Sequence, residues 1–597
     1  MALLSVLRPR LGWLPSGRGF VVGILVLAGG FFVTVVLDTL YIQRRRRTTM
    51  ANRQKAVESS GKSATDSKDD VADLGLYTDP VELSHADLQP RTVTDSDIPL
   101  DTRADGAGPR QAVHVTSPAL YTIPGIPLEL QAMYIQGRFV NPFPNWRDKT
   151  LYDFFRWRWT RTGGNGLPTA PESLADALPV EVPDWKVLRS PERLLPMAPC
   201  GNKGNGIITP TSSSPKPLDP TDPASMEASW VMNFSTHPDG PKSSPSPLLP
   251  PATTARQRRS DDHSRPKLNT SPAIPSSSSP NLTVTWLGQS TCYVQLPGLN
   301  ILTDPIFQPR TVTSWLGPKR LRPVPCTLDQ LAVDVVLVSH NHYDHLEWAC
   351  VEQLGDSVLW FVPLGMRQWF TRHGIRRVVE MNWWQFCDLR VVTRRPSAEP
   401  GSEPVTMVHR FRVAATPAQH WSGRGLLDSN RSLWCGWFVR RLASQVVDPS
   451  SLDISAERTI AVDPAADLTT PFLVDPTAPD LGSFYHCGDT GYYAPLFRTI
   501  RQHLGPVTLA ALPIGSYLPR WYMCHQHINP DDAVLIHRDV AATRSIGVHW
   551  ATFMMSDEDY LAPPRDLRRA LEFHDLPVAQ FVTPSIGLTL TIAINSS

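Results

Sequence analysis

The chain has 597 residues, with 57 basic and 56 acidic side chains and a formal net charge of +1. This near-neutral balance gives no global positive field, so we exclude nucleic acid as a partner. The eight cysteines are scattered without a C-x-x-C pair, which argues against a zinc ribbon and a disulfide framework. The 58 prolines are about twice the usual share of about 5%, which indicates that much of this long chain is unfolded.

The N-terminus contains a predicted membrane anchor. Residues 1–18 are basic, and a transmembrane helix is predicted over residues 19–43 because the stretch 19–37 is almost entirely apolar. Nineteen such residues span about 30 Å of hydrocarbon as a helix. The basic run 44–47 then lies at the interface and faces the cytosol or the matrix. A cleaved signal peptide is the alternative, but the length of the run and the downstream arginines disfavour it.

The first acidic residue is Asp38, whereas Arg8, Arg10 and Arg18 precede it. This bias is typical of a mitochondrial presequence, although the segment has few hydroxyl groups. We therefore expect a single-pass membrane protein of the mitochondrial inner membrane or of an endomembrane.

Composition divides the rest of the chain. Segments rich in Pro, Ser, Thr or Asp bury too little apolar surface to fold alone. The predicted organisation is a disordered linker at 44–115, the first part of the folded unit at 116–202, a Ser- and Pro-rich disordered insertion at 203–280, and the main folded domain at 281–597 with a further insertion at about 443–482.

The most informative motif follows a short apolar strand at 335–338. The next residues place three imidazoles and a carboxylate within six positions: His340, His342, Asp344 and His345. The pattern predicts metal ligands on the loop that leaves the strand, and His and Asp are both zinc ligands. A chance cluster of surface histidines is the alternative. Four ligands are enough to begin two metal sites but not to complete them.

Three later segments supply candidate ligands in the same way. Each is a short apolar run that ends in His or Asp, and they contribute His420, Asp489 and His549. One such residue is more often an ordinary structural side chain. Four clusters at strand ends, the segment 340–345 and these three, argue against coincidence.

This order of motifs resembles the metallo-β-lactamase superfamily. The resemblance implies an α/β fold, a four-layer αβ/βα sandwich with metals at one edge. It also implies that His340, His342 and His420 hold one Zn²⁺, that Asp344, His345 and His549 hold a second, and that Asp489 bridges them. Asp304 would be a carboxylate that orients a ligand histidine, and a turn-starting Asp before Pro is an equal alternative.

A closer resemblance covers roughly residues 137–200 and 281–580. These segments are similar to the phospholipases D that hydrolyse N-acylphosphatidylethanolamine, on the motifs GRFVNP (137–142), TWLG (285–288), LTDPIF (302–307), GPKR (317–320), WFVPLG (360–365), PIG (513–515), YLPRW (517–521) and QHINP (526–530). The resemblance implies substrate contacts by Tyr343, Gln526 and His527. For His527 the alternative is a polar residue before a helix, because Asn529-Pro530 indicates an N-cap.

One position departs from the family. Gln289 stands where many relatives have His, so any proton-transfer role is lost there. We do not expect it to bind metal, since seven ligands are already found.

The chemistry follows from the predicted metals. A water shared by two zinc ions ionises near neutral pH, and the hydroxide would attack phosphorus while Asp344 orients it. The leaving alkoxide could be stabilised by zinc coordination, or by a proton from His527 or from the attacking water. The predicted function is zinc-dependent hydrolysis of N-acylphosphatidylethanolamine to N-acylethanolamine and phosphatidic acid.

Other readings of the same residues stay open. They are a lactonase, another phosphodiesterase, or an inactive lipid-binding scaffold. The predicted partners are a membrane phospholipid and the bilayer through one helix, and a homodimer stays an open alternative.

Overall fold

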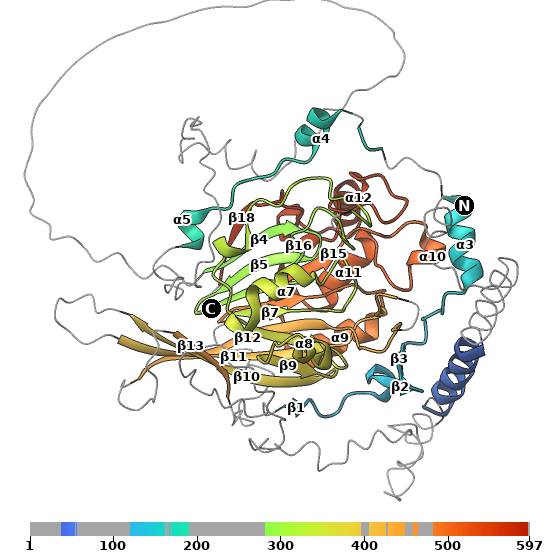
Figure 1. Ribbon diagram of the computed structural model, residues 1–597, viewed down its shortest axis with the longest axis horizontal. Helices are drawn as coiled ribbons and strands as arrows, with labels where there is room; N and C mark the ends of the chain where they lie inside the picture. Colours follow the sequence, from blue (N-terminus) through green and yellow to red (C-terminus); the bar gives the residue numbers. More distant parts are fainter. Residues whose placement is uncertain are drawn as a thin grey trace, which may run out of the picture. The chain divides into compact units, whose positions relative to one another are not determined.

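The computed structural model describes residues 37–53, 55, 120–161, 166–168, 170–189, 281–313, 315–395, 405–425, 428–447, 458–463 and 481–594. They belong to one compact unit, whereas the second unit, 201–279, contains most of the predicted insertion 203–280 and lies outside the described residues. The description below therefore concerns the first unit alone (Figure 1).

Two mixed sheets form the core of this unit. Among the described residues the larger sheet has nine strands in the order β1-β10-β11-β12-β14-β15-β16-β17, with β13 also paired to β10. Its strands are β1 (Tyr121–Thr122), β10 (Gln385–Arg395), β11 (Val405–Thr416), β12 (Gly436–Val447), β13 (Arg458–Val462), β14 (Ser483–His486), β15 (Val507–Pro513), β16 (Ala542–Val548) and β17 (Phe581–Val582).

The smaller sheet has seven strands in the part of the chain that is described, in the order β18-β4-β5-β6-β7-β8-β9. They are β4 (Asn281–Gly288), β5 (Thr291–Leu296), β6 (Leu299–Thr303), β7 (Val335–Leu337), β8 (Leu359–Pro363), β9 (Val378–Met381) and β18 (Thr589–Ala593). A separate hairpin joins β2 (Met133–Ile135) to β3 (Arg138–Val140).

Helices complete the layers. They are α3 (Leu151–Thr160), α4 (Pro171–Ala177), α5 (Trp185–Leu188), α7 (Trp348–Leu354), α8 (Arg367–Arg372), α9 (Ala494–Leu504), α10 (Arg520–Met523), α11 (Pro530–Asp539) and α12 (Ala562–Phe573), with short 3₁₀ turns η2 (Leu128–Leu130), η3 (Leu328–Gln330), η4 (Gly355–Ser357) and η6 (Val578–Gln580). Helix α11 packs on β15 and β16 between α9 and α12. Helices α7 and α8 share a buried apolar cluster with the smaller sheet.

The two sheets face each other across tryptophan side chains. Trp437 of β12 donates its indole N–H to the carbonyl of Val338 at 2.8 Å, and its ring lies 5.9 Å from that of Phe361 in β8. Trp286 of β4 stacks on Trp550 at 5.3 Å. Because a buried indole needs an acceptor, such contacts fix how the sheets meet. This arrangement confirms the predicted metallo-β-lactamase fold.

Local sequence explains where α11 begins. Asn529 is its N-cap and accepts from the backbone N–H of Asp532, whose side chain accepts in return from the N–H of Asn529. Pro530 fills the first turn, where its missing N–H costs nothing. The predicted cap after His527 is confirmed.

The structure corrects two predicted boundaries. Strand β12 continues to Val447, and β13 pairs with β10, so parts of the insertion at 443–482 belong to the larger sheet. The linker predicted to begin at residue 44 starts instead with helix, since residues 37–53 are helical. Charged side chains tie this helix to the folded unit: the Arg46 guanidinium donates to the carbonyl of Asn141 at 2.7 Å, and Arg53 donates to Leu128 at 2.9 Å.

Most of the predicted membrane anchor lies outside the described residues. Within the described ranges we find no helix that is both long and apolar enough to cross a bilayer. Residues 1–36, which hold the basic segment and most of the predicted span at 19–43, lie outside the described residues.

Candidate metal centre

Strand order explains why distant motifs meet. Strand β12 is antiparallel to both β11 and β14, and β14, β15 and β16 are parallel. Hence β11, β14 and β16 all end at the same edge of the larger sheet. The loops after these strands carry His420, Asp489 and His549. In the smaller sheet the parallel strands β6 and β7 end just before Asp304 and the segment 340–345.

Three imidazoles form what we call the three-histidine group: His340, His342 and His420. The Nε2 atom of His340 lies 2.7 Å from Nδ1 of His342, and Nε2 of His420 lies 3.3 Å from that same Nδ1. Three ring nitrogens from two loops thus point at one place, as the ligands of a single cation would.

Hydrogen bonds behind the rings set their tautomers. The Ser339 hydroxyl donates to Asp304 at 2.7 Å, so it accepts from Nδ1–H of His340, which lies 2.9 Å away. Nδ1–H of His420 donates to the carbonyl of Gln526 at 2.9 Å. In both rings Nε2 is left with its lone pair toward the site, because a neutral imidazole has one N–H.

A second group, the mixed group, consists of Asp344, His345 and His549. Oδ2 of Asp344 lies 3.3 Å from Nε2 of His345 and 3.3 Å from Nε2 of His549. The rings of the two histidines stack with centroids 5.3 Å apart. One carboxylate and two imidazoles again suit a single cation.

Asp489 lies between the two groups. Its Oδ2 is 3.2 Å from Nε2 of both His345 and His549. The same oxygen lies 4.0 Å from Nε2 of His340 and 3.7 Å from Nε2 of His420. The carboxylate therefore occupies the position that a bridge between two cations requires.

Asp304 anchors the site from behind. Its carboxylate accepts from the Ser339 backbone N–H and hydroxyl, both at 2.7 Å. It also accepts from His345 Nδ1 at 2.9 Å and from His486 Nε2 at 2.7 Å. Because Nδ1 of His345 is used here, Nε2 of that ring faces the mixed group. The full burial of Asp304 and its bond to His345 support the predicted role in orienting a ligand histidine, which stays a prediction. The residue also lies in the bend before Pro305, as the alternative expected.

Gln289, which stands where many relatives have His, forms hydrogen bonds to predicted ligands. Its side-chain Nε2–H donates to Oδ2 of Asp344 at 2.7 Å. Its backbone carbonyl accepts from the N–H of His549 at 2.9 Å. Gln289 thus touches two members of the mixed group. Sequence analysis missed this contact, and also those of Ser339 and His486, because hydrogen bonds between distant loops leave no local pattern.

Burial and charge act differently on the two groups. Burial lowers the pKa of His340 and His342 well below the usual value and that of His420 to about 4, so these rings are neutral near pH 7. Burial also acts on His549, but the carboxylates of Asp489 and Asp344 outweigh it and raise its pKa to about 9. The three-histidine group is thus ready to bind a cation, whereas the mixed group must first lose protons.

The donor set fits a metal. Three buried atoms that face the site, Nε2 of His345, Nε2 of His549 and Oδ1 of Asp489, have no hydrogen-bond partner among the described residues. Buried polar atoms are rarely left in this way without an ion or water to satisfy them. Imidazole nitrogens and carboxylate oxygens are ligands that zinc accepts.

The three residues predicted to contact the substrate differ in their contacts. Nδ1 of His527 lies 3.8 Å from Oδ2 of Asp489, and the ring is mostly buried. The Tyr343 ring lies 4.8 Å from the guanidinium carbon of Arg424. Gln526 contributes its carbonyl to His420, while its side-chain amide lies 3.5 Å from the sulfur of Met523. The substrate roles of all three stay predictions.

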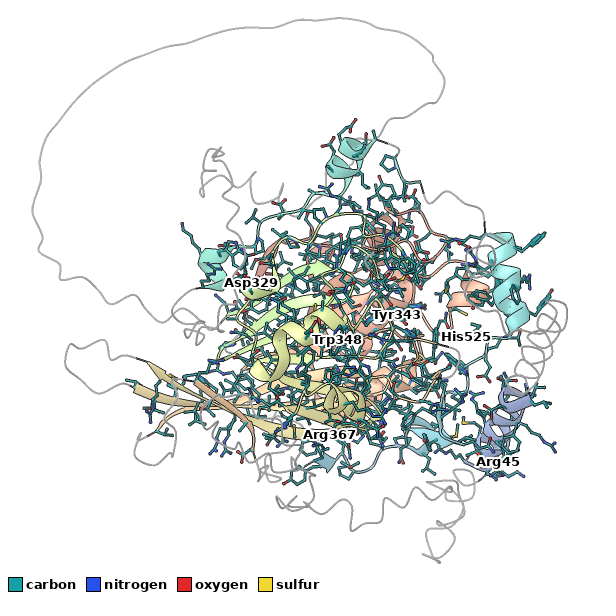
Figure 2. The ribbon with its side chains drawn as sticks, viewed as in Figure 1. Arg45, Asp329, Tyr343, Trp348, Arg367 and His525 are labelled. Atoms are coloured by element: carbon teal, nitrogen blue, oxygen red, sulfur yellow. The ribbon has the colours of Figure 1, made fainter. Side chains whose placement is uncertain are left out.

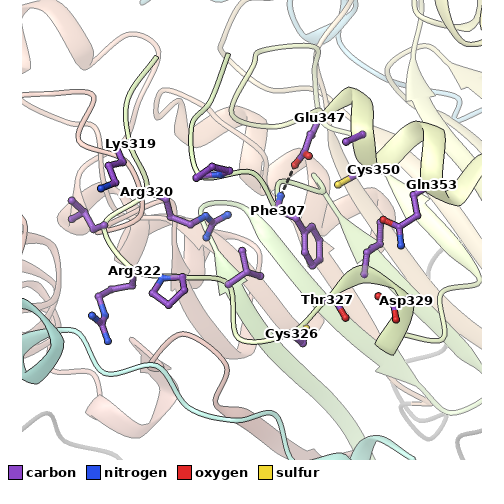
Figure 3. Close-up of a pocket in the computed structure, with 16 residues that line it drawn as sticks. Phe307, Lys319, Arg320, Arg322, Cys326, Thr327, Asp329, Glu347, Cys350 and Gln353 are labelled. Carbon is purple, nitrogen blue, oxygen red and sulfur yellow. Dashed lines mark hydrogen bonds between the residues drawn. The ribbon is translucent and has the colours of Figure 1, made fainter. Parts of the chain in front are cut away.

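A separate cavity lies beside α7. It has a volume of about 700 Å³ and is lined by none of the predicted site residues. Glu347 lies at its wall, where the carboxylate accepts from the N–H of Phe307 at 2.6 Å (Figure 3). The cavity is distinct from the metal centre, because no predicted metal ligand lines it.

Known proteins are similar to this chain. A family described as "Beta-lactamase superfamily domain" matches residues 299–447 and 452–550. The N-acyl-phosphatidylethanolamine-hydrolyzing phospholipase D 1 of Caenorhabditis elegans is 37% identical over 318 residues, which cover 51% of this chain and 74% of that protein. The mitochondrial N-acyl-phosphatidylethanolamine-hydrolyzing phospholipase D of Saccharomyces cerevisiae is 28% identical over 460 residues, 76% of this chain and 75% of that protein.

A solved structure is also similar. The metallo hydrolase Igni18 from Ignicoccus hospitalis aligns with a TM-score of 0.32 and 19% identity, over 52% of this chain and 98% of that chain.

Proposed function

Because the chain belongs to the family of N-acylphosphatidylethanolamine-hydrolysing phospholipases D, metal-dependent hydrolases of the metallo-β-lactamase superfamily, we propose that it converts N-acylphosphatidylethanolamine to N-acylethanolamine and phosphatidic acid. The observation that carries the proposal is the position of Asp489, whose Oδ2 lies within 4.0 Å of ring nitrogens from both ligand groups. Such an arrangement suits a two-metal hydrolase.

We assign one Zn²⁺ to the three-histidine group and one to the mixed group, with Asp489 shared. Zinc bound there would ionise a water near pH 7 and stabilise the charge that develops on the phosphoryl oxygens. This assignment is supported by the donor types and by the tautomers that Ser339, Gln526 and Asp304 impose.

The chain's own residues position the reaction. Gln289 donates a hydrogen bond to one oxygen of Asp344 and so fixes the orientation of the carboxylate. In this orientation Asp344 would accept a hydrogen bond from the attacking water. Nδ1 of His527 has no hydrogen-bond partner among the described residues and faces Asp489, so it is available to bind a phosphoryl or leaving-group oxygen. Tyr343 would meet the substrate at the rim of the site.

A membrane location belongs to this proposal. The lipid substrate resides in a bilayer, the segment 19–37 is apolar, and the yeast relative is named as mitochondrial. We therefore propose attachment to a mitochondrial membrane through the predicted helix at 19–43, with an endomembrane as the alternative.

The test is a lipid-product assay on purified full-length protein. We expect N-acylethanolamine and phosphatidic acid in equimolar amounts, loss of both on chelation, and recovery with zinc. Metal analysis should give about two ions per chain. Metal-loaded protein that leaves this lipid intact but cleaves other esters would show that the substrate assignment is wrong, and protein without bound metal would favour a scaffold.

A further inference from the structure

Helix α3 turns its aromatic side chains outward. Tyr152, Phe155 and Trp159 are 72%, 63% and 91% exposed. Their spacing of three and four residues puts them on one face of the helix. Apolar side chains of a helix normally face the core, so an exposed stripe marks a surface that another body covers. We propose that α3 docks on the interface of an anionic bilayer and holds the catalytic unit there.

The opposite edge of α3 is fixed to the catalytic unit. The Trp157 ring stacks on Tyr522 of α10 with centroids 5.2 Å apart, and its indole N–H donates to Asp557 at 3.0 Å. Arg161, one turn further on, donates to the carbonyl of Ser556 at 3.0 Å. A helix held along this narrow stripe keeps a constant orientation, so its aromatic face points away from the unit.

The charged residues of α3 favour an anionic membrane as the surface that it binds. The helix contains Arg156 and Arg158, both exposed, and one acidic residue, Asp153. Asp153 is 4% exposed, and its carboxylate closes a capping box with Thr150 and lies 3.3 Å from the Arg147 guanidinium. A helix that shows aromatic rings and arginines together is typical of one lying in the headgroup region of anionic membranes. Tyr and Trp also favour that region, where a ring has both apolar and polar neighbours.

The segments next to α3 connect this helix to the metal centre. Residues 141–150 lead directly into α3, and Asn141 at their start donates to the carbonyl of His420 at 2.6 Å. On the other side, α10 carries Tyr522 and Met523, and the Met523 sulfur accepts from Gln526. Figure 1 shows α3 beside α10, and Figure 2 labels His525 in the loop that follows α10.

The helix at 37–53 binds the same segment. Arg46 donates to the carbonyls of Asn141 and Phe143 at 2.7 and 3.0 Å. Leu37, Leu40 and Tyr41 in the same helix are exposed. Docking of α3 would therefore place the loop that bears His527 close to lipid, a consequence that rests on the proposed function, whereas docking itself does not.

The test uses full-length protein with Cys200 and Cys524 replaced by Ser and an environment-sensitive fluorophore at Trp159→Cys. The protein is added to vesicles of equal parts phosphatidylcholine and phosphatidylglycerol. We expect a blue shift and quenching by lipids that carry a nitroxide in the upper acyl chain. Replacing Arg158 by Gln should weaken docking about fivefold, the effect of one basic residue near an anionic surface.

The matched control places the fluorophore at Phe573→Cys, the exposed end of α12. This position should stay aqueous, because Glu572 and Asp575 flank it. A Trp159 probe that stays aqueous on these vesicles overturns the proposal, and so does an equal shift at both positions. If the Trp159 probe instead shifts on self-association without lipid, which sedimentation would show, the face binds a second copy and the proposal fails.

A second experiment separates docking from catalysis. The variant Tyr152→Ala/Phe155→Ala/Trp159→Ala should hydrolyse bilayer substrate at least tenfold more slowly yet keep wild-type turnover on a dispersed short-chain substrate. Loss on both substrates argues against a docking role. Wild-type protein that makes no product from either substrate, but whose Trp159 probe enters the bilayer, would sink the proposed function and leave the docking intact.

Discussion

The metal centre and helix α3 differ in the exposure of the side chains that we expect to function there. At the centre six of the seven predicted ligands are buried and His342 is partly buried, and most are held by a second buried group such as Asp304, Ser339 or Gln289. On α3 the aromatic rings are exposed, and a narrow stripe of contacts supports the helix. Chemistry requires ligands fixed to within a fraction of an ångström, whereas a lipid surface requires only the right kind of side chain.

The largest effect should come from Asp489→Asn. The amide keeps the shape but removes the charge that both ligand groups share, so turnover should fall on the order of 10³-fold, the upper range for losing one electrostatic contact at a reacting centre. The measurement is N-acylethanolamine release, with metal content determined on the same sample. A variant with full activity would mean that the bridging group lies elsewhere.

Asp304→Asn tests the support behind the ligands. The variant loses the negative acceptor for His345 and His486 while leaving every predicted ligand in place. We expect metal affinity or activity to fall about 10–100-fold, as for other groups that orient a ligand. Titration with zinc should recover much of the activity, which a catalytic role would not allow. Failure of zinc to restore any activity in a folded variant would contradict a positioning role.

This contrast also explains what the sequence could predict. The segment 340–345 holds four ligands on one loop after a buried strand, so the metal site and the fold were both accessible from local patterns. Gln289 could not be placed, because its bond to Asp344 joins loops 55 positions apart. Strand β13 was missed since Asp- and Pro-rich neighbours conceal a five-residue strand at 458–462. The outward face of α3 was missed because a helical pattern shows which side chains align, not which side faces solvent.

Tyr343→Phe probes a predicted substrate contact that is next in sequence to the predicted ligands. The ring keeps its contact with Arg424, which lies 4.8 Å away, and loses only the hydroxyl. If the hydroxyl binds the anionic phosphodiester, KM should rise at least about tenfold, the value of one hydrogen bond to a charged group, with metal content unchanged. Equal KM values for the variant and the wild type would remove Tyr343 from the predicted substrate contacts.

The smallest effect concerns Lys149, beside the N-terminus of α3. Its ammonium lies over the Tyr522 ring at 5.3 Å and has no hydrogen-bond partner among the described residues. Burial lowers its pKa from 10.5 to about 8. Between these values the unfolded chain binds more protons than the folded one, so this group makes the free energy of unfolding rise with pH from about 8 to 10.5. Its destabilising effect is largest below pH 8.

Lys149→Met should therefore raise Tm slightly at pH 7 and flatten the pH dependence of Tm above pH 8. Lys186→Met, on the separate helix α5, is the control and should leave that slope unchanged. A steeper slope in Lys149→Met would mean that the charged form is stabilised in place, as an ion pair would do.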